Sequence, residues 1–78
     1  MIIKSQCGAD LINMDNVFYI IYDQVNDSNP YRIKAVSNNQ QYWIEIGRYK
    51  SEERVKEIIS DIFGDTALCQ KTYIMPKE

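Results

Sequence analysis

The sequence predicts an α+β fold, in which a small, curled antiparallel β-sheet of four to six strands carries one α-helix on one face. Three observations lead to this prediction. The chain has twelve Ile and six Tyr but only two Leu and three Ala, a composition that favours strands over helices. Two stretches alternate strictly between apolar and polar residues, and one later stretch has apolar residues at helical spacing. With 78 residues the chain can bury one modest core, so residues 1–78 are expected to form a single domain.

The two alternating stretches flank Asn38-Asn39 and predict a hairpin. Apolar residues occupy every second position, which places the charged residues and the single Trp on the opposite face. A two-residue turn at Asn38-Asn39 would set Arg32 opposite Glu45 as an ion pair. The same register would set Lys34 opposite Trp43 as a cation–π pair. A four-residue loop would shift these partners but leave every residue on its face.

Residues 51–63 are predicted to form the helix. Ser51 is a suitable N-cap, and the two glutamates after it stand where the helix dipole favours negative charge. Gly64 is expected to end the helix. The apolar stripe consists of Val55, Ile58, Ile59, Ile62 and Phe63. The strands are expected at residues 2–6, 11–13, 17–23, 31–37, 41–47 and 68–75.

The stretch 17–23 is apolar or aromatic at six consecutive positions. A strand that is apolar on both sides is usually covered on both faces, and one short helix covers only one. Two explanations are open: the sheet curls and covers its own second face, or a second subunit does so. The candidate oligomer interface is Phe18, Ile20 and Tyr22.

The charge of the chain is divided along its length. The whole chain has a net charge of −2, whereas residues 32–50 carry four cations against one carboxylate. Cations around an aromatic residue are typical of sites that hold phosphates and bases. The candidate ligand site, for a phosphate-bearing nucleotide, is Arg32, Lys34, Trp43 and Arg48. The other interpretation is that these charges pair across strands while the tryptophan packs on Lys34.

The predicted helix presents an acidic surface. Its acidic residues, together with one just after it, are Glu52, Glu53, Glu57, Asp61 and Asp65. Such a surface is most simply a solvated outer face. It can also imitate nucleic acid toward a basic host protein, which is a third possible mode of action.

Several function classes find no support in the sequence. There is no His, no Gly-rich phosphate loop and no catalytic triad motif, so no enzyme, cofactor or metal site is expected. The negative net charge argues against nucleic-acid binding through overall charge. No apolar run approaches the length of a membrane span, and residues 1–4 do not resemble a signal peptide, so we expect a cytoplasmic protein. Cys7 and Cys69 are expected to be two reduced, packed thiols rather than a disulfide.

Two segments together resemble a group of short uncharacterised proteins from low-GC Gram-positive bacteria and their phages. Residues 11–17 match an LINLDNV-like segment with Met14 in place of the usual Leu. Residues 47–54 match a G-x-Y-x-[ST]-E-E-R helix start, after which Val55 replaces the usual Ala. The resemblance covers most of residues 1–63 and transfers no activity. It implies a cytoplasmic accessory protein of a phage or mobile element that binds a host defence protein or a nucleotide signal.

The sequence therefore predicts a small, non-enzymatic binding protein that self-associates and has no membrane contact. Two alternatives stay open. One is sequestration of a phosphate-bearing nucleotide signal, an anti-defence activity. The other is acidic inhibition of a host nucleic-acid-binding or defence protein.

Overall fold

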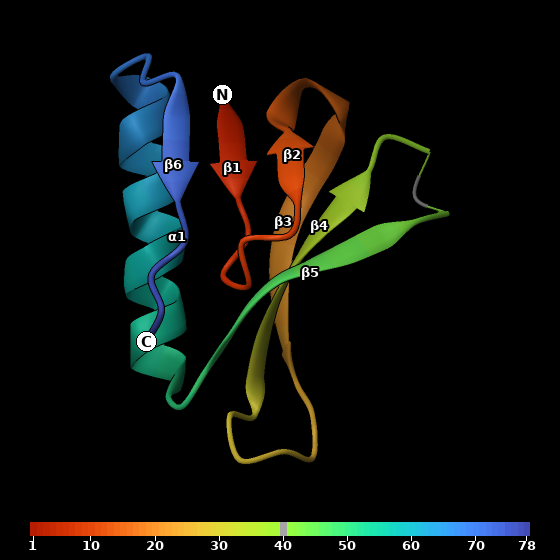
Figure 1. Cartoon of the computed structure of the whole chain (residues 1–78), viewed down its shortest axis with the longest axis vertical. Helices are drawn as coiled ribbons and strands as arrows, with labels where there is room; N and C mark the ends of the chain where they lie inside the picture. The colour runs from red at the N-terminus through yellow and green to blue at the C-terminus, as the bar shows by residue number, and fades with distance from the viewer. Residues whose placement is uncertain (40) are drawn as a thin grey trace.

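The computed structural model describes residues 1–39 and 41–78, and it contains two three-stranded β-sheets and one α-helix (Figure 1). The predicted α+β class, with four to six strands and one helix, is confirmed. The six strands are divided between two sheets rather than joined in one. In chain order the elements are β1 (Ile2–Lys4), β2 (Leu11–Asn13), the 3₁₀ turn η1 (Met14–Asn16), β3 (Val17–Gln24), β4 (Tyr31–Ser37), β5 (Trp43–Tyr49), α1 (Glu52–Ala67) and β6 (Thr72–Ile74).

The first sheet has the strand order β2-β1-β6 and brings the two ends of the chain side by side (Figure 1). β1 is antiparallel to β2 but parallel to β6. Backbone hydrogen bonds beyond the strands extend this pairing, because Ile2 donates to the Lys71 carbonyl at 2.8 Å and Met75 donates to the Lys4 carbonyl at 3.0 Å. A parallel pair needs a long connection between its strands, and here the rest of the chain provides it.

The second sheet, β3-β4-β5, is antiparallel, and α1 packs against one of its faces. The apolar stripe of the helix supplies Val55, Ile58 and Ile62, all buried. The first sheet adds Ile3, so the core lies where both sheets and the helix meet. The buried core consists of Ile3, Ile33, Ala35, Ile46, Tyr49, Val55, Ile58, Ile62 and Met75.

The hairpin of β4 and β5 has the longer of the two loops considered. The Ser37 N–H donates to the Tyr42 carbonyl at 2.9 Å, which encloses four residues. Lys34 therefore lies opposite Glu45, and the expected pairing of Arg32 with Glu45 is wrong. The face of each of these charged residues is nevertheless the predicted one, because the shift of two positions preserves the alternation.

β5 contains a β-bulge at Ile46 and Gly47, where its register against β4 shifts by one residue. The alternation continues out of phase after the bulge. As a result Tyr49 is buried in the core, while Arg48 lies on the outer side with Glu45. The prediction of a regularly alternating strand over residues 41–47 did not include this bulge.

The bulge depends on glycine. A Cβ atom on Gly47 would lie 2.6 Å from a ring carbon of Tyr49, whose side chain folds back over this position. Tyr49 is 1% exposed, and its hydroxyl donates to the Pro76 carbonyl at 2.8 Å. Burial raises the pKa of Tyr49 to about 12, so the hydroxyl keeps its proton and remains a donor at neutral pH.

The helix begins as predicted but ends later. Ser51 is the N-cap, and its hydroxyl accepts from the Arg54 N–H at 3.1 Å. Gly64 does not end the helix, which continues to Ala67. Phe63, assigned to the apolar stripe, is 75% exposed because it lies at the edge of that stripe, beyond the reach of the sheet.

The helix ends in a Schellman motif around Cys69. The Cys69 N–H donates to the Thr66 carbonyl at 3.0 Å, and the Gln70 N–H donates to the Asp65 carbonyl at 2.9 Å. Cys69 has a φ of 60°, the left-handed conformation that this motif requires and that glycine usually supplies. Because position 69 is not a glycine, the sequence pattern pointed to Gly64 as the end of the helix instead.

We predict that Gly47→Ala destabilises the fold by about 1–3 kcal/mol, because the added methyl group overlaps the buried ring of Tyr49. The measurement is urea unfolding followed by circular dichroism. Gly64→Ala is the control, since nothing lies within 4 Å of its Cβ position. It should gain about 1 kcal/mol from helix propensity. Equal stability of Gly47→Ala and the wild type would contradict the packing described.

We predict that Cys69→Gly stabilises the fold by about 0.5–1 kcal/mol, because glycine adopts the left-handed conformation without the steric cost to a Cβ atom. The exposed thiol loses little packing. The control is Cys7→Gly, which makes the same chemical change at an exposed cysteine without a positive φ. It should not stabilise the fold. Melting temperatures of the three proteins test the prediction, and a lower value for Cys69→Gly would refute it.

Candidate functional site

The side of β3-β4-β5 that faces away from α1 carries most of the predicted site residues. Because alternate residues of a strand point the same way, this surface collects side chains from all three strands. The bulge in β5 adds Arg48, which a regular strand would have turned inward. We call this surface the outer face; it consists of Tyr19, Ile21, Asp23, Arg32, Lys34, Trp43, Glu45 and Arg48.

Trp43 contacts two cations on this outer face. The guanidinium carbon of Arg32 and the ammonium nitrogen of Lys34 each lie 4.7 Å from the centroid of the Trp43 ring. The cation–π contact between Lys34 and Trp43 occurs, but diagonally, since Trp43 lies opposite Val36; the predicted placement of Lys34 directly opposite Trp43 is wrong. Arg32 makes a second contact of the same kind. Trp43 keeps 51% of its surface exposed. The structure therefore brings together three of the four predicted ligand residues around one partly open ring.

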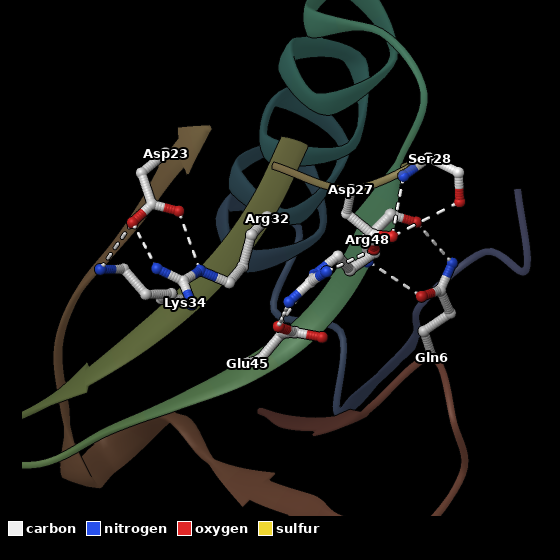
Figure 2. A network of polar contacts seen from close by, with 8 residues as sticks. All are labelled: Gln6, Asp23, Asp27, Ser28, Arg32, Lys34, Glu45 and Arg48. Atoms are coloured by element: carbon white, nitrogen blue, oxygen red, sulfur yellow. Dashed lines mark hydrogen bonds and ion pairs between the residues drawn. The ribbon is translucent and has the colours of Figure 1, made fainter. Parts of the chain in front are cut away.

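Asp23 of β3 neutralises both of these cations (Figure 2). Its Oδ1 accepts from Arg32 Nε at 2.9 Å. Its Oδ2 accepts from Arg32 Nη2 at 2.8 Å and lies 3.0 Å from Lys34 Nζ. The bonds from Arg32, followed by Lys34, hold the pKa of the Asp23 carboxyl well below its usual range.

Arg48, the fourth predicted ligand residue, joins a separate part of the network (Figure 2). Its guanidinium pairs with Glu45 at 3.0 Å and with Asp27 of the loop before β4. The bond that Arg48 donates to Asp27, more than the one it donates to Glu45, raises the pKa of Arg48. On the backbone, the Gln6 amide oxygen accepts from the Arg48 N–H at 2.9 Å, and the Gln6 amide nitrogen donates to the Arg48 carbonyl at 3.0 Å.

The outer face is electrically balanced. The cations Arg32, Lys34 and Arg48 face the carboxylates Asp23, Asp27 and Glu45. The excess of positive charge expected in residues 32–50 is absent from this surface, because two of the neutralising carboxylates come from outside that segment. The interpretation with charges paired across strands is the one the structure bears out.

The predicted oligomer interface is divided by the fold. Phe18 is 57% exposed and packs edge to face against Tyr19, with ring centroids 5.3 Å apart. Ile20 and Tyr22 are partly buried and pack against the core on the side of α1, so the fold separates them from Phe18. The Tyr22 hydroxyl also donates to Glu52 at the start of the helix at 3.1 Å. Alternation separates the two faces of a strand but does not say which one the helix covers.

The residues that sequence reasoning missed are the apolar ones on the opposite side of β3. Tyr19 is 42% exposed and Ile21 is 44% exposed. Both lie on the outer face at the edge of the sheet, since β3 pairs with β4 on one side and with no other strand within residues 1–39 and 41–78. The continuous apolar run in β3 was a valid signal of an uncovered face, although it did not identify the face.

Other features of the described residues add no chemistry. No cluster of three or more His, Cys, Asp or Glu that could hold a metal ion occurs among them. No helix in this part of the chain is long and apolar enough to cross a membrane. Cys7 and Cys69 are free but exposed, so the expectation that they are packed is wrong. A hydrogen bond with Ser5 is the main cause of a lowered pKa for Cys7.

Comparisons with protein-family models, with curated proteins and with solved structures found no match to this chain.

We predict that Asp23→Asn lowers the free energy of unfolding by about 1 kcal/mol at pH 7, a value limited by the partial exposure of the Asp23 ion pairs. Because the pKa of Asp23 is lowered on folding, its contribution is present above the unfolded-state pKa of about 4 and is lost as the pH falls toward the lower folded value. The difference between the wild type and Asp23→Asn in urea unfolding should therefore shrink below about pH 4.

The control is Asp15→Asn, since Asp15 makes no ion pair with the described residues. It should leave the stability at pH 7 nearly unchanged. A loss for Asp23→Asn that stays constant from pH 7 to pH 3 would contradict the role of its charge.

Proposed function

We propose that this protein is a non-enzymatic interaction protein that forms a homodimer through the free edge of β3. The observation that carries the proposal is that edge. Within the described residues, β3 hydrogen-bonds with β4 on one side and with no strand on the other. The free N–H and C=O groups of an apolar edge strand are a template for another strand.

The free edge of β3 lacks most of the features that usually prevent pairing. β3 is eight residues long and contains no Pro and no Lys. The irregularity of its register lies near Phe18, so Tyr19–Gln24 is a regular strand. The exposed rings of Phe18 and Tyr19 and the side chain of Ile21 form the apolar surface beside this edge.

A second copy of the chain suits this edge. Two β3 strands that pair antiparallel about a two-fold axis form a closed, self-complementary contact. In the register centred on Ile21, Ile20 of one copy lies opposite Tyr22 of the other, and opposite residues share a face. The result is one continuous six-stranded sheet made from two three-stranded ones, with both α1 helices on the same side. Because the outer face is electrically balanced, like charges do not oppose the approach of the two copies.

The biological setting of this proposal rests on the sequence resemblance. It supports an accessory protein of a phage or mobile element that acts in the bacterial cytoplasm. Nucleotide sequestration at the outer face has less support, since its cations already hold carboxylates. Acidic inhibition also has less support, because Glu52 and Glu57 pair with Lys56 and Arg54 on the same helix.

We predict that the wild-type protein behaves in light scattering as a species of twice the 9.2 kDa chain mass. Ile21→Lys should behave as a monomer, because it places a charge at the centre of the dimer contact. Ile74→Lys is the matched control: Ile74 is an exposed isoleucine on the three-residue edge strand β6. This variant should remain dimeric.

Circular dichroism spectra and melting temperatures verify that both variants are folded. A wild-type protein that stays at 9.2 kDa at the highest soluble concentration would contradict the dimer. Equal dissociation by Ile21→Lys and Ile74→Lys would contradict the role of β3.

A further inference from the structure

A second surface, away from β3, holds the positive charge that the outer face lacks. A cleft of about 560 Å³ lies between the end of β5, the first turn of α1 and the C-terminal segment. Figure 1 shows the C-terminal segment running back along α1 toward the start of that helix. We call this cleft the cationic cleft. Its charged lining residues are Arg48, Lys50, Arg54, Lys77 and Glu78.

Two of these cations are available to a ligand. Lys50 makes no ion pair with the described residues, and Lys77 only approaches the backbone carbonyl of Gln6, at 3.4 Å. Arg54 pairs with Glu57 at 3.3 Å, a contact on the exposed helix surface that an anion can replace. Arg48 is held by Asp27 and Glu45 and therefore forms part of the wall.

The walls of the cationic cleft are joined by hydrogen bonds. The Gln6 amide nitrogen donates to the Arg48 carbonyl at 3.0 Å and to the Lys77 carbonyl at 2.8 Å, so one side chain links β5 to the C-terminal segment. Arg54 Nε donates to the Glu78 main-chain oxygen at 3.0 Å, which links that segment to α1. These bonds hold the backbone of the walls and the Arg54 guanidinium in place before a ligand arrives, and such preorganisation favours binding.

The lining indicates the class of ligand. Ammonium and guanidinium groups from two sides of a cleft suit an anion with several oxygens, above all a phosphate group. The volume lies within the usual range of small-molecule sites. The one aromatic residue of the lining, Tyr49, is buried and bonded to Pro76, so no ring face is open for stacking on a base. We propose that the cationic cleft binds a phosphorylated small molecule through its phosphate groups, with Lys50, Arg54 and Lys77 in contact.

The test is titration of the full chain with inorganic pyrophosphate, followed by ¹⁵N–¹H spectra and calorimetry. Saturable shifts are expected at Lys50, Ser51 and Arg54, with weaker binding of inorganic phosphate because it has fewer charges. The variant Lys50→Gln/Lys77→Gln should bind pyrophosphate at least about tenfold more weakly.

The matched control is Lys4→Gln/Lys71→Gln, which removes two exposed lysines outside the cleft and changes the net charge equally. It should bind within about twofold of the wild type. If Lys50→Gln/Lys77→Gln does not fold, Arg54→Gln is a second variant of the cleft. It should weaken pyrophosphate binding as well. Binding should be unchanged in Ile21→Lys, since β3 contributes nothing to the cleft, so the dimer and the cleft are tested independently.

The proposal is overturned if no saturable shifts occur up to about 10 mM pyrophosphate. Such a result would mean that any dissociation constant lies above the millimolar range. It is also overturned if the two lysine double variants lose affinity equally, which would mean a diffuse effect of net charge.

Discussion

At the bulge in β5, the absence of a side chain on Gly47 allows the ring of Tyr49 to fold back over the strand and into the core. This contact organises much of the molecule. The Tyr49 hydroxyl binds the carbonyl of Pro76 and fixes the C-terminal segment beside α1. The change of phase at the bulge also turns Arg48 outward, where it binds Glu45 and Asp27. One extra residue in a strand thus links the core, the outer face and the wall of the cationic cleft.

The two surfaces of the molecule differ because of how their charges are paired. On the outer face the cations are matched by carboxylates on neighbouring strands and the adjoining loop, which leaves a neutral surface with exposed apolar side chains. In the cationic cleft, Lys50 and Lys77 make no ion pair with the described residues, although Glu78 also lines the cleft. A neutral apolar edge favours another copy of the chain, whereas unmatched cations favour an anion.

The sequence predicted local features well where short-range chemistry decides them. The strands 17–23 and 31–37 and the start of the helix at Ser51 match the structure closely. The alternation of the hairpin placed Lys34 and Trp43 on one face, where they make contact, although the predicted register between them is wrong. The end of the helix was missed, because a non-glycine residue, Cys69, adopts the left-handed conformation there. The parallel pairing of β1 with β6 was missed too, since it joins segments about seventy residues apart.

By itself the sequence determined the α+β class, the number and order of the main elements, and the presence of a strand that is apolar on both sides. These properties depend on residues close to one another in the chain. Only the tertiary structure decided which face of β3 meets the helix, and hence that Ile20 packs partly buried against the core while Ile21 is exposed. It also decided where the positive charge remains, because Asp23 and Asp27 reach the hairpin from outside it. Faces and charge balance arise from contacts between distant segments, which a local pattern does not encode.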